Sequence, residues 1–254
     1  MPLFGLGTWL ATNGGECKDA VRAALQLGFR LIDTAQMYDN HEDVRAALQE
    51  LPADAPRPFV VSKLSPTPEC HGRAGAMAQL DRTLEELGLE QLDLWLMHSP
   101  SPGKVLETWQ AMLSARDAGK VRAVGVSNFG PEQLEGLKQA GCDVPEVNQF
   151  ELHCWNQQRE LVSYCQREGI AVMSFCPLAR CKLFGQTALQ QIALETGQSE
   201  AALAIRWLLQ KVSAALRAAR AHTHVHTATE AVSCVQVPAS GASGRTQYIT
   251  PTAH

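Results

Sequence analysis

Residues 28–40 read GFRLIDTAQMYDN, a short apolar run that passes directly into a polar loop. The apolar part, residues 30–35, is typical of a buried β-strand. The preceding residues 17–28, CKDAVRAALQLG, repeat their apolar side chains with a helical period and end in Gly, as helices often do. This stretch therefore predicts a helix, a strand and a loop in succession, with Asp33 at the end of the strand and Tyr38 in the loop.

Similar units recur along the chain as far as about residue 210. The seven strand candidates, which alternate with segments of helical period, are residues 2–9, 30–35, 59–64, 92–98, 122–128, 146–151 and 170–176. Such alternation predicts an α/β fold with a parallel sheet. The sheet is either a (β/α)8 barrel or a doubly wound open sheet.

The first strand favours the barrel. Open sheets that bind dinucleotides carry GxGxxG after their first strand, whereas residues 5–10, GLGTWL, lack the third glycine and continue the strand-like run. We therefore predict a (β/α)8 TIM barrel, in which the active site lies at the carboxyl ends of the strands. The polar residues at those predicted ends, which one mouth would bring together, are Asp33, Lys63, His98, Asn128 and Gln149.

The composition changes after Trp207, where the chain becomes rich in Ala, Thr and His. We assign residues 1–210 to the barrel with strands one to seven, and residues 211–254 to an atypical C-terminal segment. Residues 222–229, HTHVHTAT, are predicted to form a loop, and an apolar run gives a possible degenerate eighth strand at residues 231–240. Two alternatives stay open: the segment completes the barrel, or the chain is a shortened form whose eighth unit is incomplete or irregular and whose strand edges are exposed.

The charge balance and the apolar runs exclude several classes of protein. The 254 residues include 22 basic and 26 acidic side chains, and the basic ones are scattered, so we expect no nucleic-acid partner. The N-terminus lacks the features of a signal peptide, and no stretch reaches the roughly 18 apolar residues that a membrane span needs. We therefore expect a cytoplasmic protein with no membrane partner.

Eight cysteines are spread along the chain without any CxxC pair. In a chain with no export signal, cysteines at such spacings are expected to be free thiols. We predict neither a disulfide framework nor a metal site.

Four residues near the predicted mouth fit the reduction of a carbonyl group. The reaction needs a hydride donor and an acid for the oxygen, and a Tyr with a pKa of about 10 is a poor acid unless its phenolate is stabilised. A Lys ammonium stabilises a phenolate, a carboxylate holds the Lys, and a His orients the carbonyl. Tyr38, Lys63 and Asp33 suit the first three roles, and His98 suits the last. Singly, each residue has an ordinary structural explanation, such as an ion pair, but their coincidence at three strand ends favours a catalytic site.

Beyond these residues, the chain resembles the aldo-keto reductase family over roughly residues 1–210. The motifs that carry the resemblance, in the family's order, are GLGTW (5–9), GFRLIDTAQMYDN (28–40), VSKL (61–64), LDLWLMHSP (92–100), GKVRAVGVSNF (119–129), VNQFELH (147–153) and SFCPL (174–178). The resemblance implies an oxidoreductase acting on CH-OH groups, which reduces small aldehydes or ketones to alcohols. It implies that the hydride comes from NADPH, with NAD not excluded, and the proton from Tyr38.

The resemblance also implies roles for individual residues. The family's four catalytic positions fall on Asp33, Tyr38, Lys63 and His98. The substrate is expected to meet Trp9, Tyr38 and His98. The nicotinamide carboxamide is expected to bind Ser127, Asn128 and Gln149, whose side chains offer donors and acceptors. Phe175 would stack on the nicotinamide ring, where most members have Tyr. The other residues expected at the cofactor are Thr8, Asp33, Pro177 and Leu178.

Near the C-terminus the resemblance is partial. Residues 237–245, VPASGASGR, are similar to the segment with which the family binds the 2'-phosphate of NADP, and Ser240 and Arg245 would be the contacts. Ala239 replaces the expected Lys, which predicts a weaker preference for NADP over NAD. A chance match in a stretch rich in Ser and Gly is the alternative.

Two further departures follow Tyr38. His41 stands where members of the family usually have Glu, and Arg45 stands where they usually have Gly. The larger side chain of Arg45 is expected to disturb the close approach of its helix to a neighbour. The loop after His98 is short, which suggests an open substrate pocket.

Other functions remain as alternatives. One is a catalytically impaired barrel, and another is a binding or regulatory protein of the same fold. A sugar-hydrolysing barrel fits less well, because Glu151 lacks a convincing second carboxylate at the strand ends. For the enzyme we expect a small-molecule carbonyl substrate as the partner, and a monomer.

Overall fold

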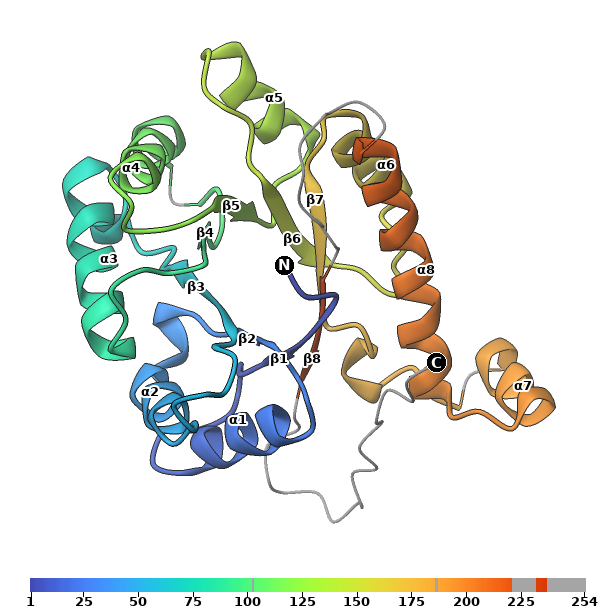
Figure 1. Cartoon of the computed structure of the whole chain (residues 1–254). Helices are drawn as coiled ribbons and strands as arrows, with labels where there is room; N and C mark the ends of the chain where they lie inside the picture. Colours follow the sequence, from blue (N-terminus) through green and yellow to red (C-terminus); the bar gives the residue numbers. More distant parts are fainter. Residues whose placement is uncertain (102, 186, 221–231, 237–254) are drawn as a thin grey trace.

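A closed barrel of parallel strands forms the centre of the structure, a computed structural model that describes residues 1–101, 103–185, 187–220 and 232–236 (Figure 1). The strands are β1 (Phe4–Gly7), β2 (Leu31–Asp33), β3 (Phe59–Leu64), β4 (Leu94–Met97), β5 (Val124–Ser127), β6 (Val147–Glu151), β7 (Ala171–Phe175) and β8 (Val232–Gln236). Strands that follow one another in the sequence are neighbours in the barrel, and β8 pairs with both β7 and β1.

The predicted (β/α)8 barrel is confirmed. Each of the seven strands expected between residues 2 and 176 is present within its predicted range. The open-sheet alternative is wrong, because β1 pairs in parallel with β8, from Phe4 opposite Ser233 to Gly7 opposite Gln236.

The eighth strand lies inside the predicted range 231–240 and closes the barrel between β7 and β1. The edges of those two strands are therefore paired. Residues 221–231 and 237–254 lie outside the described residues, and with them the predicted loop at 222–229 and the predicted contacts Ser240 and Arg245. The helix α8 (Glu200–Arg220) runs across position 211, where the composition changes. The treatment of residues 211–254 as a separate segment stays a prediction.

Helices surround the strands on the outside (Figure 1). Besides α8 they are α1 (Glu16–Gln26), α2 (His41–Gln49), α3 (Arg73–Leu87), α4 (Val105–Asp117), α5 (Pro131–Gln139), α6 (Arg159–Arg167) and α7 (Thr187–Thr196). Short 3-10 turns lie at η1 (Gln36–Tyr38), η2 (Pro68–Cys70) and η3 (Ala179–Cys181). Figure 1 shows α7 projecting away from the barrel, whereas the other helices pack along it.

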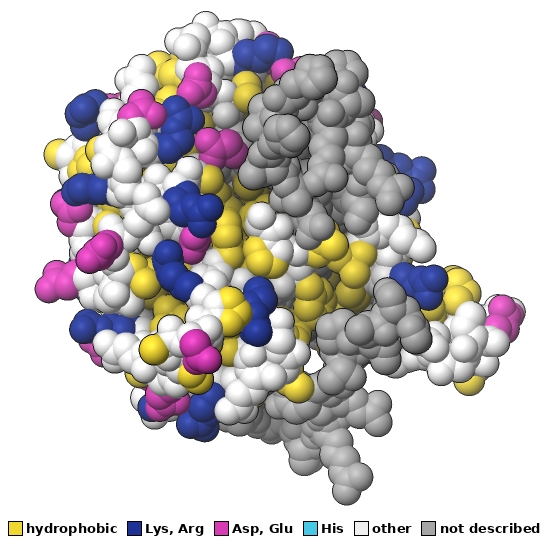
Figure 2. All heavy atoms as spheres, in the orientation of Figure 1, with side chains coloured by type: hydrophobic (Ala, Val, Ile, Leu, Met, Phe, Trp, Pro, Cys, Tyr) yellow, Lys and Arg dark blue, Asp and Glu magenta, His cyan; other side chains and the backbone are white. Residues whose placement is uncertain are grey.

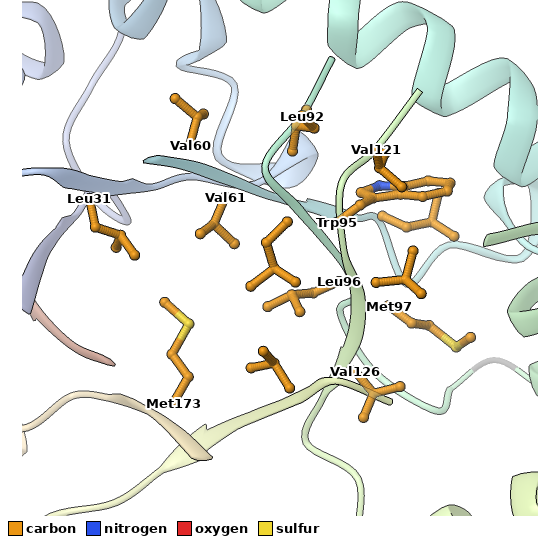
Figure 3. Close-up of a cluster of buried hydrophobic side chains, with 14 of the residues drawn as sticks. Leu31, Val60, Val61, Leu92, Trp95, Leu96, Met97, Val121, Val126 and Met173 are labelled. Carbon is orange, nitrogen blue, oxygen red and sulfur yellow. The ribbon is translucent and has the colours of Figure 1, made fainter. Parts of the chain in front are cut away.

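Side chains alternate along each strand between the barrel interior and the helices. Trp95 and Leu96 extend to opposite sides of β4: Trp95 lies beside Val121, whereas Leu96 points toward Val61 and Met173 (Figure 3). All five are at most 1% exposed. Burial of each such side chain contributes about 1.5–3 kcal/mol to the free energy of unfolding. The interior of the barrel around these residues is thus a packed apolar core.

The structure accommodates Arg45 at the surface. Its side chain is exposed on α2, extends beside Gly88, and donates through Nη1 to the carbonyl oxygen of Glu85 at 3.4 Å. Glu85 lies in the last turn of α3, where the helix dipole favours a cation. The expected disturbance of helix packing is not observed, because the bulk of Arg45 points to solvent.

His41 is buried between α2, α3 and β3, with 4% of its surface exposed. Its Nδ1 lies 2.8 Å from Oε2 of Glu86, and its Nε2 lies 3.0 Å from Oγ of Ser62. Both ring nitrogens therefore have a partner. The ring therefore links α2 and α3 to Ser62 of β3, the residue directly before Lys63.

Candidate active site

A cavity of about 270 Å³ opens at the carboxyl ends of the barrel strands. Because side chains repeat every two residues along a strand, Asp33 follows Leu31 on the interior face, and Lys63 follows Val61. Polar groups therefore lie directly above the apolar core. The predicted site residues that line the cavity are Trp9, Asp33, Tyr38, His98, Ser127, Asn128, Gln149 and Phe175.

Lys63 joins the acidic and phenolic groups of the site. Its Nζ donates to Oδ1 of Asp33 at 2.5 Å, to the carbonyl oxygen of Thr34 at 2.9 Å and to Oη of Tyr38 at 3.3 Å. Lys63 is 1% exposed and Asp33 is 5% exposed. Charges buried this deeply need a close partner of opposite sign. An ammonium held at this distance also stabilises the phenolate that remains when a Tyr releases its proton.

The loop that carries Tyr38 is anchored by Asn40. Its buried side chain donates through Nδ2 to the carbonyl oxygens of Thr8 and Ala11 at 2.9 and 3.0 Å, and it accepts a hydrogen bond from Oγ1 of Thr34 at 2.8 Å. These bonds tie the loop after β2 to the loop after β1. The hydrogen bonds of Asn40 therefore help to fix the position of the loop that carries Tyr38.

Thr8 does not line the cavity, and its contact with the cofactor stays a prediction. It is 1% exposed, and its hydroxyl donates to the carbonyl oxygen of Asp33 at 3.2 Å. This hydrogen bond joins Thr8 to the end of the neighbouring strand β2. Thr8 supports the end of β2 from behind the cavity wall.

His98 faces Tyr38 across the cavity. Their rings lie 5.8 Å apart between centroids, at an angle of 76°. Burial, together with the positive charge of Lys63, lowers the pKa of His98 to about 3, so its imidazole is neutral near pH 7. Within the described part of the chain, Nδ1 of His98 is buried without a hydrogen-bond partner. A neutral imidazole has one N–H donor and one acceptor to offer to a ligand.

Lowering the pH is expected to destabilise the fold through these histidines. Burial lowers the pKa of His41 below its ordinary value, as it does for His98. Below about pH 6.5 the unfolded chain then binds more protons than the folded chain, so stability is lost as the pH falls. The loss is up to about 1.4 kcal/mol per pH unit for each histidine that stays neutral. Urea denaturation at neutral pH and at about pH 5 measures it.

A matched variant tests the contribution of His41. His41→Gln keeps a polar side chain between Glu86 and Ser62 but does not titrate, so its free energy of unfolding should fall less steeply with pH than that of the wild type. Equal slopes for the two proteins would show that His41 is not held neutral by the fold.

Amide and hydroxyl groups gather opposite Tyr38. Nε2 of Gln149 donates to Oδ2 of Asp33 at 2.8 Å, and Nδ2 of Asn128 donates to the carbonyl oxygen of His98 at 3.0 Å and to Oγ of Ser127 at 3.1 Å. Asn128 adopts a left-handed backbone with φ of 61°, a conformation that Asn tolerates better than most residues. This side of the cavity offers the donors and acceptors that a carboxamide needs.

Two aromatic side chains complete the wall. Phe175 ends β7 and is half-buried, and Trp9 follows β1 and is half-buried as well. A flat ligand ring entering the cavity would meet these faces. Pro177 and Leu178, also predicted at the cofactor, lie buried and half-buried in the loop after β7 and are not part of this cavity wall.

Four lining residues were not predicted: Gly7, Met37, Cys176 and Arg180. Gly7, Met37 and Cys176 lie inside the motifs at residues 5–9, 28–40 and 174–178, each next to a predicted site residue, but no role was assigned to them. Arg180 lies five residues beyond the end of β7. Its only sequence signal is that it falls in a loop at the catalytic end of a barrel.

The described surface is of mixed charge. On the face in Figure 2, Lys and Arg side chains alternate with Asp and Glu side chains over the described helices.

Seven of the eight cysteines lie among the residues with described side chains, and all seven are free thiols. In the same part of the chain, no group of three or more His, Cys, Asp or Glu is placed to hold a metal ion. No helix within residues 1–220, as far as they are described, has the length and apolar character for crossing a membrane.

Comparisons with known proteins show which family this chain matches. The Aldo/keto reductase family matches residues 3–242. Glyoxal reductase of Bacillus subtilis is 39% identical over 210 residues, which cover 83% of this chain and 75% of the relative. 2,5-Diketo-D-gluconic acid reductase B of a Corynebacterium species is 38% identical over 209 residues, which cover 81% of this chain and 74% of the relative.

Solved structures resemble the barrel as well. An aldo-keto reductase of Bombyx mori in complex with NADP superimposes with a TM-score of 0.74 at 33% identity. The superposition covers 83% of this chain and 77% of the silkworm protein.

Proposed function

Because the chain belongs to the aldo/keto reductase family, we propose that its barrel mouth reduces small aldehydes or ketones to alcohols with NADPH, with Tyr38 as the proton donor. The observation that carries this proposal is the contact of Lys63 Nζ with both Asp33 and Tyr38, two residues that line one cavity. The three side chains form a connected set. Tyr38 is the acid, Lys63 is the cation that stabilises its conjugate base, and Asp33 is the carboxylate that fixes the cation. Such a set suits proton delivery to a carbonyl oxygen.

Tyr38 gives its proton to the carbonyl oxygen as that oxygen gains negative charge. The dihydronicotinamide, when bound, supplies the hydride that the carbonyl carbon accepts. The C=O double bond thereby becomes an alcohol, with one hydrogen on carbon and one on oxygen. Lys63 stabilises the phenolate left on Tyr38, and Asp33 holds Lys63 in place.

His98 orients the substrate in this proposal. Its imidazole is neutral because burial and Lys63 lower its pKa to about 3. A neutral ring can donate one hydrogen bond to the carbonyl oxygen without competing with Tyr38 as an acid. His98 lies edge-on to the Tyr38 ring, and both side chains line the same cavity.

The cofactor has suitable partners on the opposite wall. Ser127, Asn128 and Gln149 would hold the carboxamide of the nicotinamide, and the face of Phe175 would support its ring. Pro177 and Leu178 would contact the cofactor further along the loop after β7. Trp9 would form the wall of the cavity on the side where the substrate binds. Contacts of Ser240 and Arg245 with the 2'-phosphate, and hence the preference for NADP over NAD, remain predictions.

The related enzymes suggest a substrate class. Glyoxal reductase and 2,5-diketo-D-gluconic acid reductase B are named for small compounds with two carbonyl groups. Dicarbonyl compounds and carbohydrate-derived ketones are therefore the first substrates to test.

A sugar-hydrolysing reaction has less support. Among the described lining residues the cavity has one carboxylate, Asp33, and that carboxylate is paired with Lys63 and Gln149. Glu151 bonds His153 at 3.3 Å and does not line the cavity. Glycoside hydrolysis needs two carboxylates facing one bond.

Cofactor binding gives a direct test of the intact site. Addition of NADPH to the purified chain is expected to quench Trp fluorescence at micromolar concentration, because Trp9 lines the cavity. Trp9→Phe should remove most of the quenching and leave binding measurable by calorimetry. Absence of binding in a folded sample would favour the impaired-barrel or regulatory alternative.

A further inference from the structure

The loop that follows β7 has an unusual backbone beside the cavity. Cys176, Ala179, Arg180 and Cys181 have φ values of 50°, 48°, 54° and 59°. None of them is Gly, Asn or Asp, the residues that adopt this left-handed region most readily. Each such residue costs of order 1 kcal/mol or more, and such strain persists where surrounding contacts impose it, often at ligand sites. The consequence of this backbone is the placement of Arg180 on the cavity wall.

Two weak partners hold the Arg180 guanidinium at the mouth. Its Cζ lies 5.0 Å from the centroid of the Trp9 ring, and it donates a hydrogen bond to the sulfur of Cys176. A thiol is a weak hydrogen-bond acceptor, and the attraction of a guanidinium to an aromatic ring face is weaker than a hydrogen bond to a charged oxygen. A guanidinium has five N–H donors. Arg180 is also exposed, so an incoming ligand can reach it.

Among the described residues that line the cavity, Arg180 is the cationic side chain that an incoming ligand can reach. Within the described ranges Arg180 forms no salt bridge; Glu151 attracts it only at longer range and bonds His153 at 3.3 Å. Lys63 is buried and bonded to Asp33, and His98 is neutral near pH 7. An anionic group arriving at the described part of the cavity therefore meets its strongest attraction at Arg180.

We infer that Arg180 binds an anionic oxygen group, a phosphate or a carboxylate, of the ligand that occupies the mouth. The planar guanidinium matches two oxygens of such a group, and a charge-assisted bidentate contact is stronger than the contacts Arg180 makes to Cys176 and Trp9. The inference rests on the proposed function and adds to it. The anion comes either from the diphosphate of the nicotinamide cofactor or from a carboxylate carried by the carbonyl substrate.

Binding of inorganic diphosphate tests the inference without any reaction. Titration of the wild-type chain should change Trp fluorescence, because the anion draws the guanidinium away from the Trp9 ring. Arg180→Gln should weaken this binding roughly 10-fold or more, since a hydrogen bond to a charged group is lost, and Arg180→Lys should fall between the two. Arg159→Gln, an exposed arginine on α6 that does not line the cavity, is the matched control and should bind like the wild type.

Two further measurements, the Kd for NADPH and the KM values of two aldehydes, identify the source of the anion. If the cofactor supplies it, Arg180→Gln raises the Kd for NADPH roughly 10-fold, and the KM values of neutral and carboxylate-bearing aldehydes of one skeleton change equally. If the substrate supplies it, the Kd for NADPH stays constant and the KM rises for the carboxylate-bearing aldehyde alone. The inference is overturned if Arg180→Gln alters diphosphate binding, the Kd and both KM values by less than about twofold. Failure of the proposed function has a different signature, since the wild type would then neither bind NADPH nor reduce the neutral aldehyde.

Discussion

Tyr38→Phe is expected to lower kcat for reduction of a small aldehyde by about 10²–10⁴-fold, the usual contribution of a general acid. The change removes one oxygen, and with it the proton and the contact of Lys63 Nζ with Oη at 3.3 Å. The aromatic ring remains to face His98. Because little volume is lost, the Kd for NADPH and the free energy of unfolding should stay close to their wild-type values.

Single-turnover measurements separate this effect from binding. Oxidation of bound NADPH is followed in the wild type and in Tyr38→Phe at saturating aldehyde, and Met37→Leu serves as the control, since it alters a lining side chain without a proton to give. A selective loss in the chemical step supports Tyr38 as the acid. Turnover of Tyr38→Phe at nearly the wild-type rate would show that another group delivers the proton.

The positions of the catalytic candidates could be predicted because they depend on local pattern and barrel geometry. Asp33, Lys63, His98 and Gln149 each follow an apolar strand at or near its carboxyl end, and a parallel barrel gathers such ends at one mouth. Strand pattern and one topological rule were sufficient for this part of the site.

Side-chain direction in the loops could not be predicted in the same way. Thr8 was predicted at the cofactor, but the sequence could not show that its hydroxyl bonds the carbonyl oxygen of Asp33, a contact set by the pairing of β1 with β2. Arg180 was missed because a left-handed turn aims it at Trp9, and no spacing rule predicts positive φ at residues other than Gly.

The eighth strand was predicted only as a possibility for a related reason. Residues 231–237 are apolar enough for a strand but lie in a stretch whose composition differs from the rest of the chain. The pairing of β8 with β1 joins residues more than 200 positions apart, such as Phe4 and Ser233. A contact of that range depends on the closure of the whole barrel and not on a local pattern.

Lys63→Met is expected to have two large effects that can be separated. The substitution removes the ammonium that stabilises the Tyr38 phenolate, so activity should fall at least as far as in Tyr38→Phe. It also leaves the Asp33 carboxylate buried with 5% exposure and, among the described side chains, with the amide of Gln149 as its remaining partner at 2.8 Å. Breaking a buried ion pair from one side costs about 3–5 kcal/mol, a large part of a total stability of about 5–15 kcal/mol.

A double variant distinguishes the catalytic role of Lys63 from its structural role. Asp33→Asn in the Lys63→Met background removes the unpaired charge while keeping nearly the same shape, so most of the lost free energy of unfolding should return. Activity should not return, because the phenolate of Tyr38 still lacks a cation. Urea denaturation and kcat, measured on the wild type, the two single variants and the double variant, give the full cycle. If the double variant regained activity along with stability, Lys63 would serve only to hold Asp33, and the stabilisation of the phenolate would have to come from elsewhere.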